Sequence, residues 1–227
     1  MSTLIVPDVH ESHDTFMTKV LPLVENAERV VFLGDWWDTF NKDKRVKEMC
    51  RLISELMTFD IEHKITWLLG NHDCHYFFSH AWFACSGYNP RTLMVVRSML
   101  STEERGRFKI SCQVGKFLVS HAGYHPETLQ YRHDTVEEQA LDLAQAGAWH
   151  RLFGAGQSRG GEERWGGPTW LDWQDMVPHN TPQIVGHTFN EKVRVKSSSD
   201  GVNSYCIDTG LRHVLWTDGE NIEIVEL

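Results

Sequence analysis

The sequence has no long hydrophobic run: no apolar stretch in its 227 residues reaches 18 positions. A helix that crosses a bilayer needs about 20 consecutive apolar residues, so we expect no transmembrane segment and no membrane partner. Residues 1–8 also lack the basic segment and the long apolar segment of a signal peptide. We therefore expect a cytoplasmic protein.

Paired cysteines are missing as well. The five cysteines are scattered along the chain, and no two of them form a Cys-X-X-Cys pair. An odd number of scattered cysteines indicates reduced thiols rather than a disulfide framework, which agrees with a cytoplasmic location.

A basic surface is the third absence. The chain has 22 lysine and arginine residues against 31 aspartate and glutamate residues, which gives a net charge of -9. This balance disfavours extended nucleic acid as a partner, because nucleic acid attracts basic surfaces. A nucleotide substrate is still compatible with it, since a metal ion can supply local positive charge.

What the chain does contain is enough apolar sequence for a core. Hydrophobic residues make up 41% and charged residues 23%, and the length suits a single domain over residues 1–227. The thirteen histidines are the unusual feature. Histidine is the commonest side-chain metal ligand, so we ask which histidines follow strands.

The first third of the chain alternates between two patterns. Short apolar runs at residues 4–6, 29–33 and 65–69 predict buried strands, and apolar residues at helical spacing predict helices over 13–26 and 43–60. Strands that alternate with helices favour a parallel sheet, so we assign the chain to the α/β (α+β) class.

The remainder is less regular. A proline favours a helix over 90–100, and a second helix is predicted over 135–153. Between them, residues 108–112 and 116–120 predict a hairpin around Gly115. A glycine-rich loop insertion is expected around 154–168. Further strands are predicted at 183–187, 192–196, 204–207, 214–217 and 221–226.

Five of the apolar runs end in polar side chains that can bind metals. Such residues are expected to meet, because ligands bind beyond the carboxyl ends of strands in open α/β sheets. Carboxylate, amide and imidazole ligands suit a pair of divalent ions such as Mn, Fe or Zn. Asp35 is the natural bridging ligand, because a carboxylate has two oxygens. The strand-end residues are Asp8, His10, Asp35, Asp38, Asn71, His72, Asp73, His121 and His187.

These residues form five short motifs in a fixed order. The motifs are Asp-Val-His at 8–10, Gly-Asp-Trp-Trp-Asp at 34–38, Gly-Asn-His-Asp at 70–73, His121, and Gly-His-Thr at 186–188. In that order they resemble the motifs of calcineurin-like metallophosphoesterases. The resemblance implies a mixed β-sandwich flanked by helices, with the active site at one edge.

The resemblance also implies residue roles. Asp8, His10 and Asp35 would hold one metal ion. The second ion would be held by Asp35, Asn71, His121 and His187. His72 would act as general acid toward the leaving oxygen, and Asp38 would orient His72. The implied reaction is in-line attack by a metal-bound hydroxide with no covalent intermediate. We expect both ions to be manganese, with iron and zinc as alternatives.

The motifs are most similar to those of bacterial and phage-type protein phosphatases and symmetrical dinucleoside tetraphosphatases, which share Gly-His-Thr and a later Ile-Asp-Thr-Gly, here 207–210. Two positions depart from related patterns. Residues 39–40 are Thr-Phe where protein phosphatases have Arg-Gly, and Phe189 stands where many phosphodiesterases have a histidine.

Three hypotheses follow. The leading one is a phosphomonoesterase of protein-phosphatase type acting on a phosphoprotein. The second is a nucleotide pyrophosphatase or phosphodiesterase, acting on dinucleoside polyphosphates, cyclic nucleotides or nucleic acid ends. The third, an inactive binding scaffold, is disfavoured because every motif residue is present. The sequence gives no indication of oligomeric state.

Other residues lie outside the metal-ligand set. Arg159 and Arg164, on the glycine-rich segment, are candidates for binding a substrate phosphate, although a solvated loop explains them equally well. Asp73 has no assigned role beyond stabilising a turn. His75 matches no motif, and we interpret it as an ordinary surface or core histidine.

Overall fold

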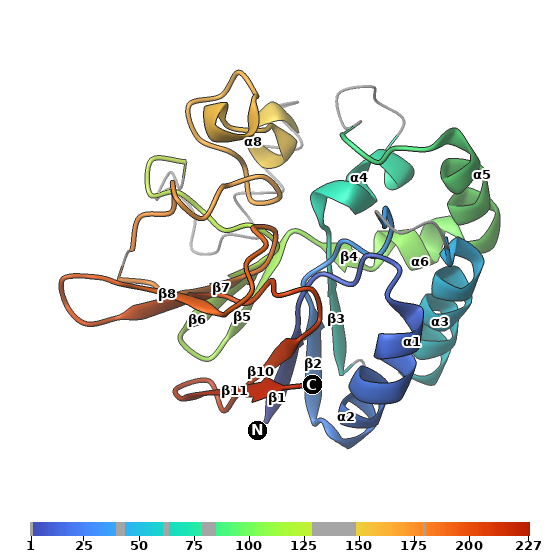
Figure 1. Ribbon diagram of the computed structural model, residues 1–227, viewed down its shortest axis with the longest axis horizontal. Helices are drawn as coiled ribbons and strands as arrows, with labels where there is room; N and C mark the ends of the chain where they lie inside the picture. Colours follow the sequence, from blue (N-terminus) through green and yellow to red (C-terminus); the bar gives the residue numbers. More distant parts are fainter. Residues whose placement is uncertain (1, 40–43, 61–63, 79–84, 129–148, 179) are drawn as a thin grey trace.

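The protein is built from two β-sheets packed face to face, with helices covering the outer face of one sheet (Figure 1). The computed structural model describes every residue except 1, 40–43, 61–63, 79–84, 129–148 and 179. No helix in the described ranges is long and apolar enough to cross a membrane.

The first sheet has six strands in the order β11-β10-β1-β2-β3-β4. Strands β1, β2, β3 and β4 are parallel to one another, while β10 runs antiparallel to β1 and β11 antiparallel to β10. The strands are β1 (Thr3–Val6), β2 (Arg29–Phe32), β3 (Ile65–Leu68), β4 (Phe108–Lys109), β10 (His213–Thr217) and β11 (Ile222–Glu226).

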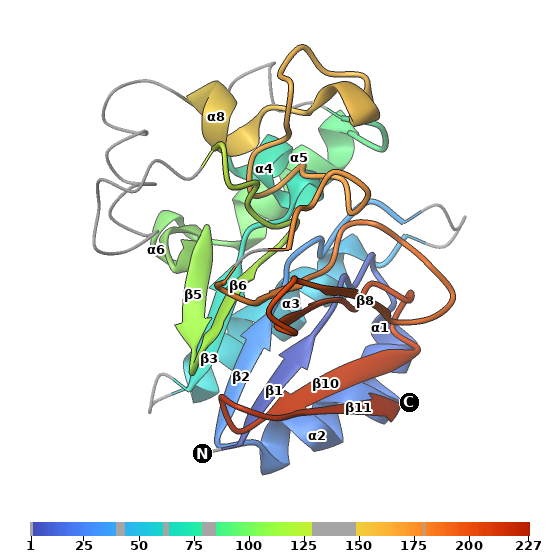
Figure 2. The same cartoon turned by 90° about the vertical axis from the view of Figure 1, so that its left-hand side faces the viewer.

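The second sheet has five strands in the order β5-β6-β7-β9-β8. Its centre is parallel, from β6 through β7 to β9, and its two edge strands pair antiparallel. Figure 2 shows it beside the first sheet. The strands are β5 (Ser111–Val114), β6 (Phe117–Ser120), β7 (Gln183–Val185), β8 (Arg194–Ser197) and β9 (Asn203–Cys206).

Helices lie against the first sheet and above its carboxyl edge (Figure 1). Residues 13–26 form one helical stretch, α1 (His13–Thr15), a π-helical turn (Phe16–Val20) and α2 (Leu21–Asn26). The other described helices are α3 (Val46–Phe59), α4 (Asn71–Phe77), α5 (Pro90–Met99), α6 (Thr102–Gly106), α8 (Trp149–Phe153) and the single 3-10 turn Gln157–Arg159.

Two apolar layers hold these elements together. Between the sheets, Ile5 and Val31 of the first sheet pack with Val119 and Ile184 of the second, and all four are fully buried. On the other face of the first sheet, strand and helix side chains form a larger cluster around Trp36. Burial on both faces explains why β1, β2 and β3 are short continuous apolar runs.

The structure confirms the predicted order of strand, helix, strand, helix, strand in the first third of the chain. The expectation of one strand over 108–112 is wrong. Residues 108–109 pair with β3 in the first sheet, and residues 111–114 pair with β6 in the second, so the chain changes sheets at Ile110. Of the helix predicted over 135–153, residues 135–148 lie outside the described residues, and α8 covers 149–153.

Candidate metal centre

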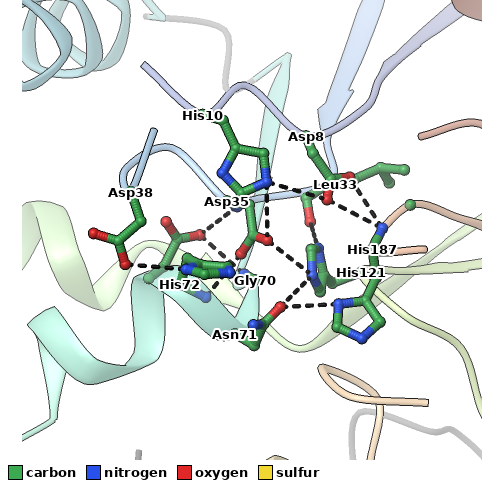
Figure 3. Close-up of polar contacts among 12 residues, drawn as sticks. Asp8, His10, Leu33, Asp35, Asp38, Gly70, Asn71, His72, His121 and His187 are labelled. Atoms are coloured by element: carbon green, nitrogen blue, oxygen red, sulfur yellow. Dashed lines mark hydrogen bonds and ion pairs between the residues drawn. The ribbon is translucent and has the colours of Figure 1, made fainter. Parts of the chain in front are cut away.

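Six side chains with metal-binding atoms meet at the carboxyl edge of both sheets (Figure 3). They come from loops that directly follow β1, β2, β3, β6 and β7, so both layers of the sandwich contribute to one site. The six are Asp8, His10, Asp35, Asn71, His121 and His187.

The first group consists of Asp8, His10 and Asp35. His10 Nε2 lies 4.0 Å from Asp8 Oδ2 and 3.6 Å from Asp35 Oδ2. One ligand atom from each residue lies within 4.8 Å of the others, a spacing that a single divalent ion can bridge.

The second group is Asp35, Asn71, His121 and His187. His121 Nε2 lies 3.5 Å from Asp35 Oδ2 and 3.0 Å from Asn71 Oδ1. His187 Nδ1 lies 2.9 Å from the same Asn71 oxygen. The donors of this group therefore face a common point on the other side of Asp35 (Figure 3).

Asp35 belongs to both groups through one atom. Oδ2 faces His10 at 3.6 Å and His121 at 3.5 Å, while Oδ1 accepts a hydrogen bond from the backbone nitrogen of His72 at 2.9 Å. The hydrogen bond to Oδ1 thus fixes the carboxylate and with it Oδ2, the oxygen that could bridge two ions. Asp35 is 2% exposed, so water competes little for that position.

Backbone carbonyls orient two of the imidazoles. His121 Nδ1 lies 2.9 Å from the carbonyl oxygen of Leu33, and His10 Nδ1 lies 3.1 Å from that of Trp37. A carbonyl can only accept, so each Nδ1 must carry the proton. Each Nε2 is then left with a free lone pair directed at the carboxylates, the arrangement that metal-binding histidines commonly show.

Glycines let these loops approach one another closely. A Cβ on Gly70 would overlap the Asp35 carboxylate, and a Cβ on Gly186 would overlap Asp8 Oδ1. Gly34 has φ +102°, and a Cβ there would overlap the backbone of Gly70. The glycines in three of the five motifs are therefore required by contact between backbones and carboxylates.

The backbone turns sharply as it leaves each strand. His10, Asp35, Asp38 and His187 have φ values of 45°, 52°, 67° and 65°, in the left-handed region that non-glycine residues seldom adopt. Each such residue costs on the order of 1–3 kcal/mol, and such strain concentrates at functional sites. These turns aim the side chains off the strand axis toward the shared centre.

Buried negative charge is concentrated at the first group. Burial, with the charges of Asp208 and Asp35, raises the pKa of Asp8 well above its ordinary value. Burial also raises the pKa of Asp208, which the sequence did not single out. Among the described residues, Asp8 and Asp35 form ion pairs with histidines and not with lysine or arginine. A bound cation would therefore neutralise buried carboxylate charge.

The second group offers neutral imidazoles. Burial lowers the pKa of His121, and burial with the charges of His121 and Arg159 lowers that of His187 well below its ordinary value. A neutral imidazole is the form that binds metal. His187 Nε2 is buried with no hydrogen-bond partner among the described residues.

His72 lies beside the first group and is held by Asp38. His72 Nδ1 lies 3.0 Å from Asp38 Oδ2, and its ring centre lies 5.2 Å from that of His10. Burial opposes the charge on His72, but the charge of Asp35 and the hydrogen bond to Asp38 raise its pKa to about 11. Bound cations would lower this value by opposing a third positive charge.

Asp38 has two further partners from α4. His75 Nε2 lies 2.7 Å from Asp38 Oδ2, and the Tyr76 hydroxyl donates to Asp38 Oδ1. Burial opposes ionisation, but the hydrogen bonds from His72, His75 and Tyr76 lower the pKa of Asp38 to about 2. Neither His75 nor Tyr76 belongs to a motif. The sequence contained one indication of their role: His75 and Tyr76 follow His72 by three and four residues, and residues at this spacing share one face of a helix.

Asp73 has a role that the sequence did not reveal. Its carboxylate accepts hydrogen bonds from the backbone nitrogens of Asp35 at 2.8 Å, Trp36 at 2.9 Å and Gly70 at 2.9 Å. It is fully buried. Asp73 therefore ties the loop after β2 to the start of α4, and so fixes Asp35 relative to Asn71.

The two arginines are placed differently. Arg159 Nη2 donates to Thr188 Oγ1 at 3.0 Å, next to His187, and its Nε lies 2.6 Å from Asp172 Oδ2. Arg164 is mostly exposed, and its Nη1 lies 3.2 Å from Glu127 Oε2. Both arginines therefore have an acidic partner, and of the two Arg159 lies beside a residue of the candidate centre.

Two groups of oxygen and nitrogen donors, sharing one carboxylate oxygen at the edge of a β-sandwich, define a dinuclear metal-dependent hydrolase. The donors fit a pair of divalent ions, because the carboxylates are buried without lysine or arginine partners among the described residues and the imidazoles present free lone pairs. The chain belongs to the calcineurin-like phosphoesterase family, whose model matches residues 1–218.

Solved structures share the fold at low sequence identity. A cold-active protein-tyrosine phosphatase of a psychrophilic Shewanella superposes with a TM-score of 0.65 at 16% identity, covering 99% of this chain and 80% of that one. A putative diadenosine tetraphosphatase gives 0.55 at 18% identity, with 99% and 93% covered. A serine/threonine phosphatase from Saccharomyces cerevisiae gives 0.52 at 14%, with 100% and 80% covered.

None of the curated proteins compared with the chain matches it significantly. The superpositions establish the fold, and the family match establishes a phosphoesterase enzyme with a dinuclear metal centre. The choice between phosphate esters has to be argued from the site itself.

Proposed function

We propose that this protein is a metal-dependent phosphomonoesterase of protein-phosphatase type. The observation that carries the proposal is the single oxygen of Asp35 shared by two donor groups, with His72 beside it. In this proposal Asp8, His10 and Asp35 hold one ion, and Asp35, Asn71, His121 and His187 hold the other. Manganese is the metal we expect.

When bound, the two ions would neutralise the phosphate charge and lower the pKa of a water molecule to near neutrality. The chain supplies the proton for the leaving group. Because Asp38 accepts from His72 Nδ1, Nε2 is the nitrogen that carries the transferable proton. Asp38 also favours the protonated imidazole, which keeps the acid charged at neutral pH.

The preference for a monoester rests on the last motif. Phe189 follows Gly-His-Thr, at the position where many phosphodiesterases have a histidine. Its side chain is 59% exposed and offers no metal-binding atom. Arg159 contacts Thr188, next to His187, and its Nε pairs with Asp172. Its remaining N–H donors can reach the terminal oxygens of a monoester if the side chain turns toward the centre.

A specific observation also favours nucleotide pyrophosphates or phosphodiesters. The ring of Trp170 lies 5.6 Å from that of His187, and Trp170 is only partly buried. Together with the exposed Phe189 it could stack against a nucleobase. We retain this as the second candidate function.

A substrate panel with Mn²⁺ tests both candidates. We expect faster hydrolysis of p-nitrophenyl phosphate and phosphopeptides than of bis-p-nitrophenyl phosphate, dinucleoside polyphosphates or cyclic nucleotides. The His72→Asn variant should lower kcat by about 10²–10⁴-fold, while the control His13→Asn, at a histidine outside the motifs, should not. Asp35→Asn should lose bound metal. A preference for diesters would overturn the monoesterase assignment.

A further inference from the structure

A third group of metal-binding side chains lies next to the candidate centre. Cys85 Sγ lies 3.3 Å from His75 Nδ1 and 3.7 Å from His72 Nδ1, and one ligand atom from each residue lies within 4.8 Å of the others. His75 and Cys85 belong to none of the five motifs. The group is therefore separate from the six residues that face the two ions.

The two sulfur–nitrogen distances in this group match a tetrahedral zinc site. Zinc–sulfur bonds of about 2.3 Å and zinc–nitrogen bonds of about 2.0–2.1 Å place sulfur and nitrogen ligands about 3.6 Å apart. The two observed distances lie on either side of this value. Only small shifts of the side chains would therefore admit the ion.

The donor chemistry separates this group from the main centre. A thiolate with two imidazoles favours zinc, while carboxylate and carbonyl oxygens suit manganese. The main centre mixes carboxylate, amide and imidazole donors and contains no sulfur. The third group therefore favours zinc more strongly than the main centre does.

The group is built into the fold. The side chain of His75 is 1% exposed and that of His72 is 11% exposed. The segment that carries Cys85 packs on the same cluster: Gly87 lies against Asp38, and the ring of Tyr88 lies 5.2 Å from that of His75. Cys85 is thus held beside the histidines by its neighbours in sequence.

We propose that His72, His75 and Cys85 form a third metal site, selective for zinc, whose occupation inhibits the enzyme. His72 Nδ1 carries the proton of its hydrogen bond to Asp38 and also faces Cys85. One nitrogen cannot carry that proton and coordinate an ion. Zinc binding therefore separates His72 from Asp38. The inhibition rests on the proposed role of His72, whereas the binding does not.

Cobalt tests the binding without any assay of hydrolysis. Protein whose main centre is first filled with Mn²⁺ is titrated with Co²⁺, and the near-ultraviolet sulfur-to-cobalt charge-transfer band is recorded. We expect the band in wild type and in the matched control Cys112→Ala, its absence in Cys85→Ala, and its loss on addition of zinc. No band in wild type, or an unchanged band in Cys85→Ala, overturns the site.

A second variant keeps the thiol. His75→Gln should weaken cobalt and zinc binding by at least about tenfold, and unchanged affinity would also overturn the site. Zinc should then slow hydrolysis by the Mn²⁺-loaded wild type more than by Cys85→Ala. Equal inhibition of the two refutes the inhibitory role. A cobalt band in a protein that hydrolyses no phosphate ester refutes the proposed function and leaves the site intact.

Discussion

The carboxylate of Asp73 accepts a hydrogen bond from the backbone nitrogen of Asp35 at 2.8 Å, across 38 residues of sequence. It accepts two more from Trp36 and Gly70. Asp35 is the residue shared by both donor groups, so its position depends on a side chain that does not itself face the ions. Four expectations concern this arrangement and its neighbours.

Replacing Asp73 by asparagine should destabilise the protein. An amide nitrogen in place of one carboxylate oxygen would face a backbone donor, leaving at least one buried N–H without an acceptor. We expect a loss of about 1–3 kcal/mol in the free energy of unfolding and a lower affinity for Mn²⁺. Denaturant unfolding and elemental analysis measure both, with the exposed Asp200→Asn as control. Wild-type values for both quantities would refute this role for Asp73.

The metal-free protein should lose stability as the pH rises from about 6.5 to 8. Burial and the charge of Asp35 raise the pKa of Asp73 to about 8, and the pKa of His72 is raised to about 11. Both groups bind protons more tightly when folded, so their stabilisation falls as pH rises through this range. The lowered pKa values of His121 and His187 affect stability only below about pH 6.5, where these histidines become protonated in the unfolded chain.

Urea titrations at several pH values measure this slope. Bound cations favour ionised carboxylates, so Mn²⁺ should flatten or reverse it. Asp73→Asn should flatten it without metal, because the variant removes one of the groups that bind protons more tightly when folded. Stability of the metal-free wild type that stays constant or rises between about pH 6.5 and 8 would contradict the expectation.

The Asp38→Asn variant should keep its metal and lose turnover. Asp38 contacts His72, His75 and Tyr76 rather than the two donor groups, so metal content should stay near normal. It also raises the pKa of His72, so the alkaline limb of the kcat profile should move to lower pH. A variant that loses metal, or that keeps the wild-type pH profile, would show that Asp38 acts differently.

Gly186→Ala should displace Asp8. The new methyl group would overlap Asp8 Oδ1. Both carboxylate oxygens of Asp8 also accept a hydrogen bond from the backbone nitrogen of His187 at 3.1 Å. We expect fewer than two ions per chain by elemental analysis. Gly106→Ala is the matched control, because nothing lies within 4 Å of its added Cβ. Equal metal content in the two variants would argue against a ligand role for Asp8.

Strand and helix order in the first third of the chain could be predicted because both signals are local. Apolar runs such as residues 29–33 and helical spacing over 43–60 appear directly in the sequence. The change of sheet at Ile110 could not be predicted. The partners of residues 108–109 and 111–114 are β3 and β6, and nothing within residues 108–114 identifies either.

The motifs identified the residues that meet at the strand edge but not how they are aimed. The left-handed backbone at Asp35 and Asp38 could not be predicted, because most aspartates are not left-handed, although aspartate adopts this region more often than most residues. The contacts of His75 and Cys85 with His72 are likewise tertiary, since Cys85 comes from a segment outside the motifs. The local sequence pattern identifies the candidate ligands, and contacts between distant segments set their geometry.

The single Asp35 oxygen that faces both His10 and His121 has a consequence for metal uptake. If two ions share this oxygen, as proposed, they cannot bind independently, and occupation of either site would change the affinity of the other. Thermodynamic linkage makes this coupling reciprocal, with the same factor in both directions. Loading by stepwise titration should therefore deviate from the sum of two independent isotherms, and Asp35 is the residue through which we expect the two equilibria to be coupled.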